Sequence, residues 1–329
     1  MVTAVPGVTE RERTDRAAVR RPHRPMRRHP ARMAAVSAVM TIAALLSTAG
    51  VHGAAAATPR RAADPLAGTA MRSTLAARAG SVTAAVEDLR TGQTWVENPS
   101  ARDQTASIIK ADILQTLLRQ AEVRQRPLDG ADPAVIERMI ENSDNDAAGA
   151  LWRLVGASSA VGAYNAKAGL SQTVLNTQGY WGESTTSALD QIRLLRALVL
   201  PGSALDAGAQ RYALDLMSHV ESDQAWGVSG SVPAGVSVAL ENGWLPLFGD
   251  DTDWEVNSIG RIRGDGRWYL VAILTGHDPS MAYGVATISR MSALIWAGLK
   301  PVVEPALGGV LSFPSRRRPG RGGTLRTGR

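Results

Sequence analysis

The feature that most limits the fold is a long helical block with strand-like segments on both sides of it. Residues 107–220 have an almost wholly helical pattern of apolar residues. The segments that are typical of strands are residues 81–89, 93–97, 236–240, 254–263 and 267–275. Two connecting turns, Arg90-Thr91-Gly92 and Gly264-Asp265-Gly266, are hairpin signals. One sheet must therefore be assembled from distant parts of the chain, and the helical block must form a second lobe.

These elements predict an α/β fold of the α+β type. An antiparallel sheet built from N- and C-terminal segments is flanked by helices, and an all-helical lobe is inserted at about residues 107–220. The flanking helices are expected over residues 64–79, ending at Gly80, and over residues 282–299. The chain of 329 residues has room for this domain, which we place at residues 64–305. A cleft where the two lobes meet is the expected place for a site.

The positive charge of the chain lies at its two ends. Nine arginines and three acidic residues give residues 1–32 a net charge of +6, and six arginines give residues 316–329 another +6. Since the whole chain has a formal charge of +6, residues 33–315 carry −6. An acidic body argues against a nucleic-acid-binding face, so we expect no nucleic acid among the partners. Residues 315–329 are predicted to be a disordered basic tail.

Residues 1–57 have the organisation of a basic leader followed by a signal peptide. An uncharged, alanine-rich stretch, residues 33–50, leads into Ala54–Ala57, small residues of the kind that signal peptidase accepts. We therefore expect cleavage near Ala57 and a secreted, extracellular protein. The alternative is an uncleaved membrane anchor, because the stretch just reaches spanning length. Met26 or Met33 is an alternative start of translation.

Two scarce residue types argue against several chemistries. The absence of cysteine excludes disulfides, thiol catalysis, cysteine-based zinc sites and a lipid-modified cysteine. Three of the five histidines precede residue 60, so we expect no metal site. Gly-rich phosphate loops and the His-Glu-x-x-His motif are absent, and we expect no other cofactor. His219 (one turn after Asp215) and His277 (beside Asp278) leave a Ser-His-Asp triad open, but the Gly-x-Ser-x-Gly motif is absent.

Ser107 and Lys110 form the first of two motifs that carry chemistry. The chain has only three lysines, and this one follows a serine by three positions at the start of the helical block. Residues three apart share one face of a helix, and the helix N-terminus offers free N–H donors beside the serine. A partly desolvated lysine can take the proton of a serine hydroxyl that acts as nucleophile. The alternative is a first-turn serine with a solvated lysine.

The second motif, Ser143-Asp144-Asn145, lies between two predicted helices. A serine, an acid and an amide at such a place can shuttle a proton, brace the loop and bind a substrate carbonyl. The alternative is a capping box, in which Ser143 and Asp146 begin a helix over residues 146–155.

Ser-x-x-Lys followed by Ser-Asp-Asn is the signature pair of class A β-lactamases and penicillin-binding proteins. The chain resembles the class A β-lactamase-like serine hydrolases of this superfamily from about residue 66 to about residue 300, and it looks closest to a short actinobacterial-type branch. The stretches ASIIKADIL, ENSDNDAAGALW and NGWLP carry the resemblance. It implies a serine hydrolase that acts on β-lactams or peptidoglycan-type peptides through an acyl-serine intermediate, without a cofactor, and we expect a monomer.

The resemblance implies catalytic roles for three residues. Ser107 would be the acylated nucleophile, Lys110 its base or proton relay, and Ser143 the group that passes a proton to the leaving nitrogen. Asn145 would hold the amide carbonyl of the substrate.

The third family motif, Lys-Thr-Gly on an edge strand, falls at Glu241-Asn242-Gly243. Gly243 would let the substrate lie against the strand, and the backbone N–H groups of Ser107 and Trp244 would form an oxyanion hole. The resemblance therefore implies a substrate-binding set of Asn145, Glu241, Asn242, Gly243 and Trp244. For Trp244, as for Trp226, packing in the core is the alternative.

Glu241 departs from the family pattern, because a carboxylate stands where the family has lysine. A unit charge pair about 4 Å apart is worth about 4 kcal/mol at an effective dielectric constant near 20. Capture of anionic substrates should therefore fall by orders of magnitude. Glu241 is also expected to raise the pKa of Lys110 and hold it protonated. The alternative is a register shift that points Glu241 to solvent.

The second departure concerns deacylation, in which β-lactamases of this class use a glutamate to activate water. Leu175-Asn176 resembles the end of the family's Glu-x-x-x-Asn element, but the position four before Asn176 is Gln172, and an amide is no general base. Glu183 is the only acid in the loop over residues 170–183, and we expect it to be an acidic side chain at the N-terminus of the next helix, residues 187–200. We therefore expect no efficient turnover of a β-lactam. The alternative function is a catalytically impaired or acylation-only relative that binds envelope peptides.

Overall fold

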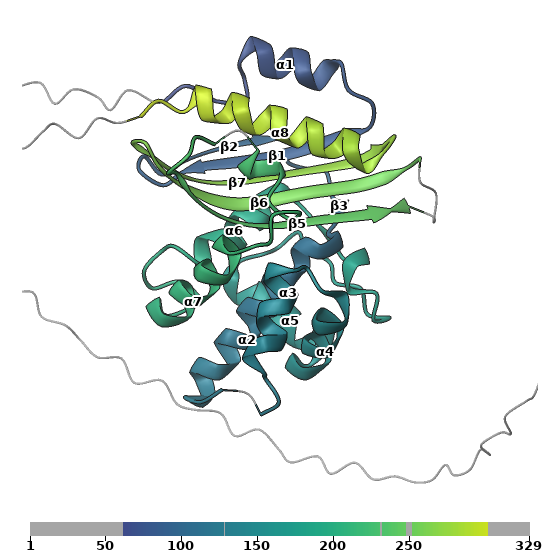
Figure 1. The fold of residues 1–329 in the computed structure, drawn as a ribbon, viewed down its shortest axis with the longest axis vertical. Helices are drawn as coiled ribbons and strands as arrows, with labels where there is room; N and C mark the ends of the chain where they lie inside the picture. Colours follow the sequence, from purple (N-terminus) through teal and green to yellow (C-terminus); the bar gives the residue numbers. More distant parts are fainter. Residues whose placement is uncertain (1–61, 128, 231, 248–251, 302–329) are drawn as a thin grey trace, which may run out of the picture. The chain divides into compact units, whose positions relative to one another are not determined.

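Five strands form one antiparallel sheet in the order β2-β1-β7-β6-β5, so that early and late parts of the chain lie side by side (Figure 1). The computed structural model describes residues 62–127, 129–230, 232–247 and 252–301. The strands are β1 Ser81–Asp88, β2 Gln93–Glu97, β5 Ser237–Pro246, β6 Trp254–Gly264 and β7 Arg267–Asp278. Every residue of β1 pairs with β7. The prediction of a sheet built from both chain segments is confirmed.

Helices cover both faces of this sheet (Figure 1). Two of them, α1 and α8, pack on one face, and the helical lobe packs on the other. The helices are α1 Thr69–Ala76, α2 Lys110–Arg124, α3 Pro133–Glu141, α4 Asn145–Val155, α5 Ala157–Ala168, α6 Ala188–Ala197, α7 Ala207–Ser218 and α8 Met281–Gly298, with short 3-10 turns η1 Ala106–Ile109, η2 Trp181–Glu183 and η3 Gly227–Ser229. The mixed architecture and its helical lobe agree with the predicted fold class.

The alternation of side chains along each strand divides the core into two parts. On β5, Ala239 packs with the helical lobe, whereas the next residue, Leu240, packs with α1 and α8. Since successive side chains of a strand point to opposite faces, Glu241 and Gly243 lie on the lobe side of the sheet. This parity brings two residues of the third motif, Glu241 and Gly243, to the junction between sheet and lobe.

A second, two-stranded sheet was not predicted. It pairs β3 Asp103–Gln104 with β4 Thr185–Thr186, and two-residue strands are too short to show a period in the sequence. The pairing ties the segment before Ser107 to the end of the loop before α6.

Some element bounds differ from the expected ones for local reasons. α1 begins at Thr69 because Asp64 Oδ1 accepts a hydrogen bond from Leu66 N (2.8 Å), so the chain turns before the helix. β5 continues to Pro246, since its ladder to β6 is unbroken through the polar residues after Leu240. The predicted leader (residues 1–57) and the predicted tail (residues 315–329) lie outside the described residues. Within the described part of the chain, we find no helix with the length and apolar character needed to span a membrane.

The first eight residues of α2 are all buried, although several are polar. Burial raises the pKa of Asp112 to about 7, whereas an unfolded aspartate titrates near 4. The folded protein therefore binds this proton more tightly than the unfolded chain does. The free energy of unfolding must then fall as the pH rises between these two values.

Replacement of Asp112 with asparagine is expected to flatten the pH dependence of stability. Between pH 5 and pH 8 the unfolding free energy of the wild type should fall by about 2–3 kcal/mol more than that of the variant. Urea denaturation at the two pH values measures the difference. Asp129→Asn is the matched control, because this aspartate is exposed. An equal change of the unfolding free energy between pH 5 and pH 8 in all three proteins would show that Asp112 does not titrate in this range.

Candidate active site

The segment that leads into Ser107 is held by β6. Asn257 Nδ2 donates hydrogen bonds to the carbonyl oxygens of Gln104 (2.7 Å) and Thr105 (3.1 Å). Ala106 then takes a φ of 46°, which non-glycine residues rarely adopt, and η1 begins. The chain thereby turns sharply, and Ser107 lies just before the N-terminus of α2.

Lys110 connects the two sequence motifs through its side-chain nitrogen. Nζ lies 3.0 Å from Ser107 Oγ, 2.8 Å from Ser143 Oγ and 2.9 Å from Asn145 Oδ1, and it also donates to the backbone oxygen of Ser143. An ammonium has only three hydrogens for these neighbours. A neutral amine can give its two hydrogens to the two carbonyl oxygens and accept a hydroxyl proton with its lone pair. The arrangement therefore suits proton transfer between a serine and Lys110.

Burial sets the basicity of Lys110. The side chain has no exposed surface, and this desolvation lowers its pKa to about 8, although the carboxylates of Glu241 and Asp144 oppose the shift. The expectation that Glu241 holds the pKa of Lys110 high is wrong in its net result, because the lost hydration of the ammonium outweighs both carboxylates. About a tenth of the amine is neutral at pH 7, which suits a general base.

Ser143 is free for this contact because its neighbour caps the helix. Asp144 is the N-cap of α4, and its side chain accepts a hydrogen bond from Ala147 N (2.7 Å). The alternative in which Ser143 and Asp146 form the capping box is therefore wrong. Ser143 has a φ of 53°, and its hydroxyl meets Lys110 instead.

Glu241 is buried on the lobe side of β5. It is 1% exposed and pairs with Ile259 of β6 in regular register, so the alternative of a solvent-directed side chain is wrong. Burial raises the pKa of Glu241 well above its ordinary value, and the charge of Lys110 opposes that rise. Glu241 Oε2 has no hydrogen-bond partner among the described residues. One oxygen of this acid is therefore buried without a hydrogen bond among the described residues.

Asn242 lies on the opposite face of the strand from Glu241. Its Nδ2 donates to the backbone oxygens of Gln224 (2.7 Å) and Trp226 (3.4 Å), and the residue is 2% exposed. The structure therefore does not bring the side chain of Asn242 to Ser107. Trp244 does reach the site, and it also packs on Trp226 with ring centroids 5.9 Å apart.

Gly243 lies directly against the turn that carries Ser107. A Cβ atom at this position would lie 2.6 Å from Ser107 N, 2.9 Å from Ile108 N and 3.0 Å from Thr105 O. All three atoms belong to the backbone, so no side chain can rotate away.

Gly243→Ala is expected to push η1 away from β5 and to lower both stability and acylation. Overpacking of this kind costs about 1–3 kcal/mol, which thermal or urea denaturation measures. Gly68→Ala serves as the control, because a Cβ there meets nothing within 4 Å. Equal stability of the two variants would contradict the close approach of β5 and η1.

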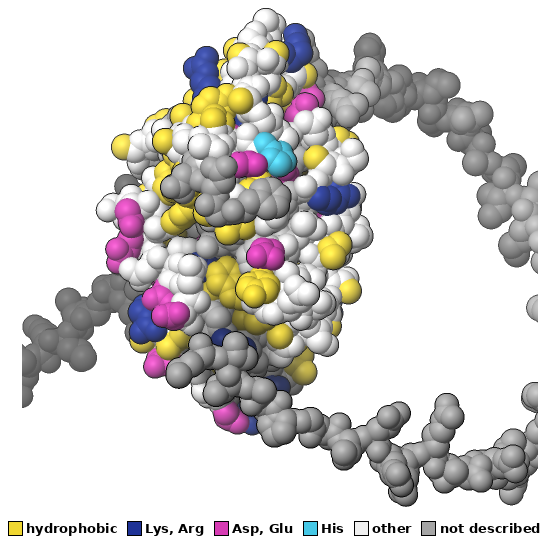
Figure 2. Space-filling model, turned by 90° about the vertical axis from the view of Figure 1, so that its right-hand side faces the viewer, with side chains coloured by type: hydrophobic (Ala, Val, Ile, Leu, Met, Phe, Trp, Pro, Cys, Tyr) yellow, Lys and Arg dark blue, Asp and Glu magenta, His cyan; other side chains and the backbone are white. Residues whose placement is uncertain are grey.

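A cavity of about 300 Å³ opens beside Ser107. Its wall is formed by Ala106, Ser107, Asn145, Gly179, Tyr180, Trp181, Gly182, Glu183, Trp244 and Leu245. Figure 2 shows a face in whose middle yellow hydrophobic side chains lie beside a magenta acidic side chain, with most of the dark-blue side chains further out. Lys110 and Glu241 do not form part of the wall, because both are buried behind it.

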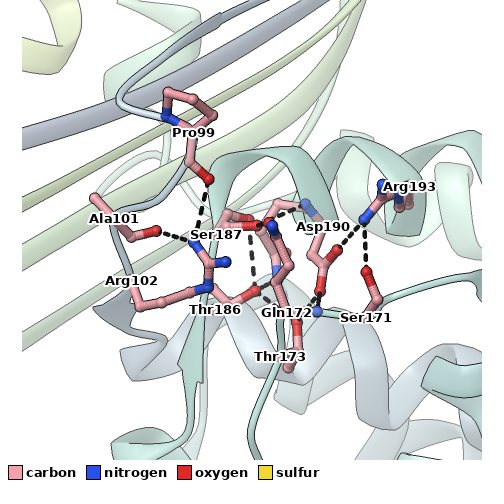
Figure 3. Close-up of polar contacts among 11 residues, drawn as sticks. Pro99, Ala101, Arg102, Ser171, Gln172, Thr173, Thr186, Ser187, Asp190 and Arg193 are labelled. Carbon is pink, nitrogen blue, oxygen red and sulfur yellow. Dashed lines mark hydrogen bonds and ion pairs between the residues drawn. The ribbon is translucent and has the colours of Figure 1, made fainter.

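The base of the loop that closes this cavity is a polar network (Figure 3). Gln172 Oε1 accepts a hydrogen bond from Ser187 Oγ (2.6 Å), and Gln172 N donates to Asp190 Oδ2 (2.6 Å). Thr173 Oγ1 donates to the same carboxylate oxygen (2.9 Å). Gln172 is therefore engaged with the N-terminus of α6 and is not part of the cavity wall.

Glu183 lies elsewhere than expected. It ends η2, four residues before Ser187, the N-cap of α6, so it is not a charge in the first turn of that helix. Its side chain is exposed, lines the cavity with Ser107, and accepts a hydrogen bond from Asn176 Nδ2 (3.4 Å). Glu183 is the carboxylate that the loop presents to the site.

Two aromatic residues of the site were not predicted from the sequence. Tyr180 and Trp181 line the cavity, and the Trp181 ring centroid lies 5.4 Å from Lys110 Nζ. The available signal was an aromatic pair between two glycines, Gly179 and Gly182, directly before Glu183.

The two described histidines do not join Ser107. His219 Nδ1 contacts the backbone oxygen of Asp215 (2.8 Å), and His277 Nδ1 contacts Asp253 (3.1 Å). Neither lines the cavity. The Ser-His-Asp alternative thus finds no support in the arrangement of the described residues.

Comparisons with known proteins agree with this architecture. The family described as the beta-lactamase enzyme family matches residues 133–299. "Putative lipoprotein LppW" of Mycobacterium tuberculosis is 28% identical over 226 residues, which cover 65% of this chain and 69% of that protein. Among solved structures, a beta-lactamase from Chitinophaga pinensis has a TM-score of 0.61 at 19% identity, over 69% of this chain and 96% of that one. PBP-A has a TM-score of 0.60 at 18% identity, over 69% and 92% of the two chains.

The structural likenesses concern the fold, and the family match covers half of the chain. The match begins after Ser107 and Lys110, so the first motif is joined to the matched region by its contacts with Ser143 and Asn145. The chain belongs to the beta-lactamase enzyme family.

Proposed function

We propose that the protein is an exported serine hydrolase that forms an acyl intermediate on Ser107 with β-lactams or cell-wall peptide amides. The observation that carries this proposal is the placement of Lys110 Nζ between Ser107 Oγ, Ser143 Oγ and Asn145 Oδ1. A lysine with a pKa of about 8 in contact with a serine at a cavity wall has the geometry of a nucleophile and its base.

Acylation would proceed in two proton-coupled steps. Neutral Lys110 takes the proton of Ser107 while Oγ attacks the carbonyl carbon of the amide. The oxyanion that develops is stabilised by the backbone N–H groups of Ser107 and Trp244. When the bond from carbon to nitrogen breaks, Ser143 passes a proton to the leaving nitrogen and is reprotonated from Lys110. Asn145 would hold the substrate, since it lies on the cavity wall.

Deacylation is the slow step in this proposal. Gln172 supplies no carboxylate, and its side-chain oxygen already accepts a hydrogen bond from Ser187. The acyl-enzyme would then accumulate, as in penicillin-binding proteins, rather than turn over rapidly.

The experiment is intact-mass analysis of the full chain after incubation with two reagents. A fluorophosphonate, which needs no recognition of a substrate carboxylate, tests the nucleophile, and a fluorescent penicillin tests the β-lactam site. We expect a fluorophosphonate adduct on Ser107 that is absent from Ser107→Ala, and a slowly released penicillin adduct. Rapid hydrolysis of a chromogenic cephalosporin would contradict slow deacylation, and the absence of both adducts would overturn the hydrolase.

A second function is favoured by one residue. Glu241 stands where the family has lysine, and it is buried beside Lys110. This replacement supports a relative that binds envelope peptides without reacting, and the same mass measurement identifies it by unmodified Ser107.

Export belongs to the proposal as well. It is supported by the signal-like organisation of residues 1–57 and by the name of the mycobacterial relatives, "Putative lipoprotein LppW". This sequence has no cysteine to carry a lipid. Secretion followed by N-terminal sequencing should give a start near residue 58, and a chain retained whole in the membrane would contradict cleavage.

A further inference from the structure

The charge of the cavity beside Ser107 favours one class of substrate. Glu183 is the only acidic or basic side chain on its described wall, and it is exposed. Arg153 lines a neighbouring cavity of about 330 Å³ that shares Gly179 and Trp181, but it does not line this one. A carboxylate that entered beside Ser107 would therefore meet a like charge and no cation on the wall.

The buried groups behind the wall do not supply the missing cation. Lys110, mostly protonated at pH 7 because its pKa is about 8, has no exposed surface, and its hydrogens are used by oxygen atoms of Ser143 and Asn145. The carboxylates of Glu241 and Asp144 both interact with its charge. Whether Glu241 is neutral or ionised, it contributes no positive potential at the site.

The uncharged part of the wall is suited to a cation. Tyr180, Trp181 and Trp244 line the cavity together with Glu183, and Tyr180 is 62% exposed. Aromatic faces attract ammonium groups, and the attraction grows where water is partly excluded. The Glu183 carboxylate is oriented by Asn176 Nδ2. A carboxylate beside exposed aromatic surface favours the binding of an alkylammonium group.

We propose that the acyl donor of Ser107 carries a primary ammonium group near the scissile carbonyl, as the side chain of a diamino acid does, with Glu183 as the residue that selects it. This inference rests on the proposed function. In the acylation step the bond from Ser107 Oγ to the carbonyl carbon forms, the bond to the leaving group breaks, and the serine proton passes to Lys110. Glu183 does not act on these atoms, and it determines which acyl group is bound.

The test uses the full chain and three 4-nitrophenyl esters, those of Nα-acetyl-lysine, Nα-acetyl-norleucine and Nα-acetyl-glutamate. The burst of nitrophenolate in a stopped-flow instrument gives the acylation rate, after subtraction of the Ser107→Ala background. We expect the lysine ester to react at least about tenfold faster than the norleucine ester, and the glutamate ester to be slowest. In Glu183→Gln the ratio of lysine to norleucine rates should fall about tenfold.

Glu137→Gln is the matched control, because it removes an exposed carboxylate on α3 that does not line the cavity. It should leave the ratio unchanged. Equal rates for the lysine and norleucine esters would overturn the substrate class, and a lysine preference that survives Glu183→Gln would overturn the role of Glu183. The absence of a burst with all three esters, together with unlabelled Ser107, would instead overturn the proposed hydrolase and the substrate class with it.

Discussion

Replacement of Lys110 with methionine is expected to slow the acylation of Ser107 by about 100- to 10,000-fold. A positioned general base contributes about this factor to a reaction rate. The basic atom in contact with Ser107 Oγ is Lys110 Nζ, at 3.0 Å. Methionine keeps much of the volume of the buried side chain and removes the base. The rate of fluorophosphonate labelling, followed by mass spectrometry, measures the effect.

The pH dependence of the same reaction distinguishes a lost base from a disturbed fold. Since the pKa of Lys110 is about 8, the labelling rate of the wild type should rise about tenfold per pH unit below that value and level off above it. In Lys110→Met this rise should disappear. Lys167→Met removes an exposed lysine on α5 and is the control. A pH profile that is the same in both variants would show that Lys110 is not the base.

Glu241→Lys is expected to accelerate acylation by an ordinary, carboxylate-bearing penicillin about 10- to 100-fold. The substitution places a cation at a position where the chain now has a buried acid. A charge pair about 4 Å apart is worth up to about 4 kcal/mol, and the cost of burying a second cation beside Lys110 reduces this gain. The second lysine should also lower the pKa of Lys110, so the rise of the rate with pH should begin at a lower pH. The rate of formation of the penicillin adduct measures both effects.

Glu241→Gln separates the two contributions of this site. It removes the carboxylate that raises the pKa of Lys110 but adds no cation for the penicillin. We therefore expect its pH profile to move to lower pH, with a smaller gain for the penicillin than in Glu241→Lys. An unchanged penicillin rate in Glu241→Lys would mean that this side chain does not influence the site.

Much of the fold could be predicted from the sequence because its signals are local. The strands around Arg90-Thr91-Gly92 and Gly264-Asp265-Gly266 are recognised by their turns, and both hairpins are present. The β3–β4 pair has no such signal, because its two-residue strands are far apart in the sequence and pair only in the folded protein. The helix predicted over residues 64–79 began too early, because the spacing of apolar residues does not show the turn that Asp64 stabilises.

The site could be predicted where the chemistry depends on spacing across one helical turn, here from η1 into the first residue of α2. The three-residue spacing of Ser107 and Lys110 predicts their contact, and the structure has it. The net pKa of Lys110 could not be predicted, because the sequence shows the charge of Glu241 but not the depth of burial of the lysine. The position of Trp181 at the cavity wall depends on the backbone path of the loop before α6. The amino-acid composition of that loop does not determine this path.

The hydrogen bonds that hold Gln104 and Thr105 have a consequence for the stage of folding at which the candidate site forms. Thr105 Oγ1 donates to the backbone oxygen of Gly182, 77 residues later, and the adjacent Gln104 is held by Asn257, 153 residues later. The turn that carries Ser107 is therefore completed only after β6 has been synthesised and docked. A chain that lacks β6 lacks the contacts that hold this turn, so in the proposed mechanism the reactivity of Ser107 would report that folding has finished.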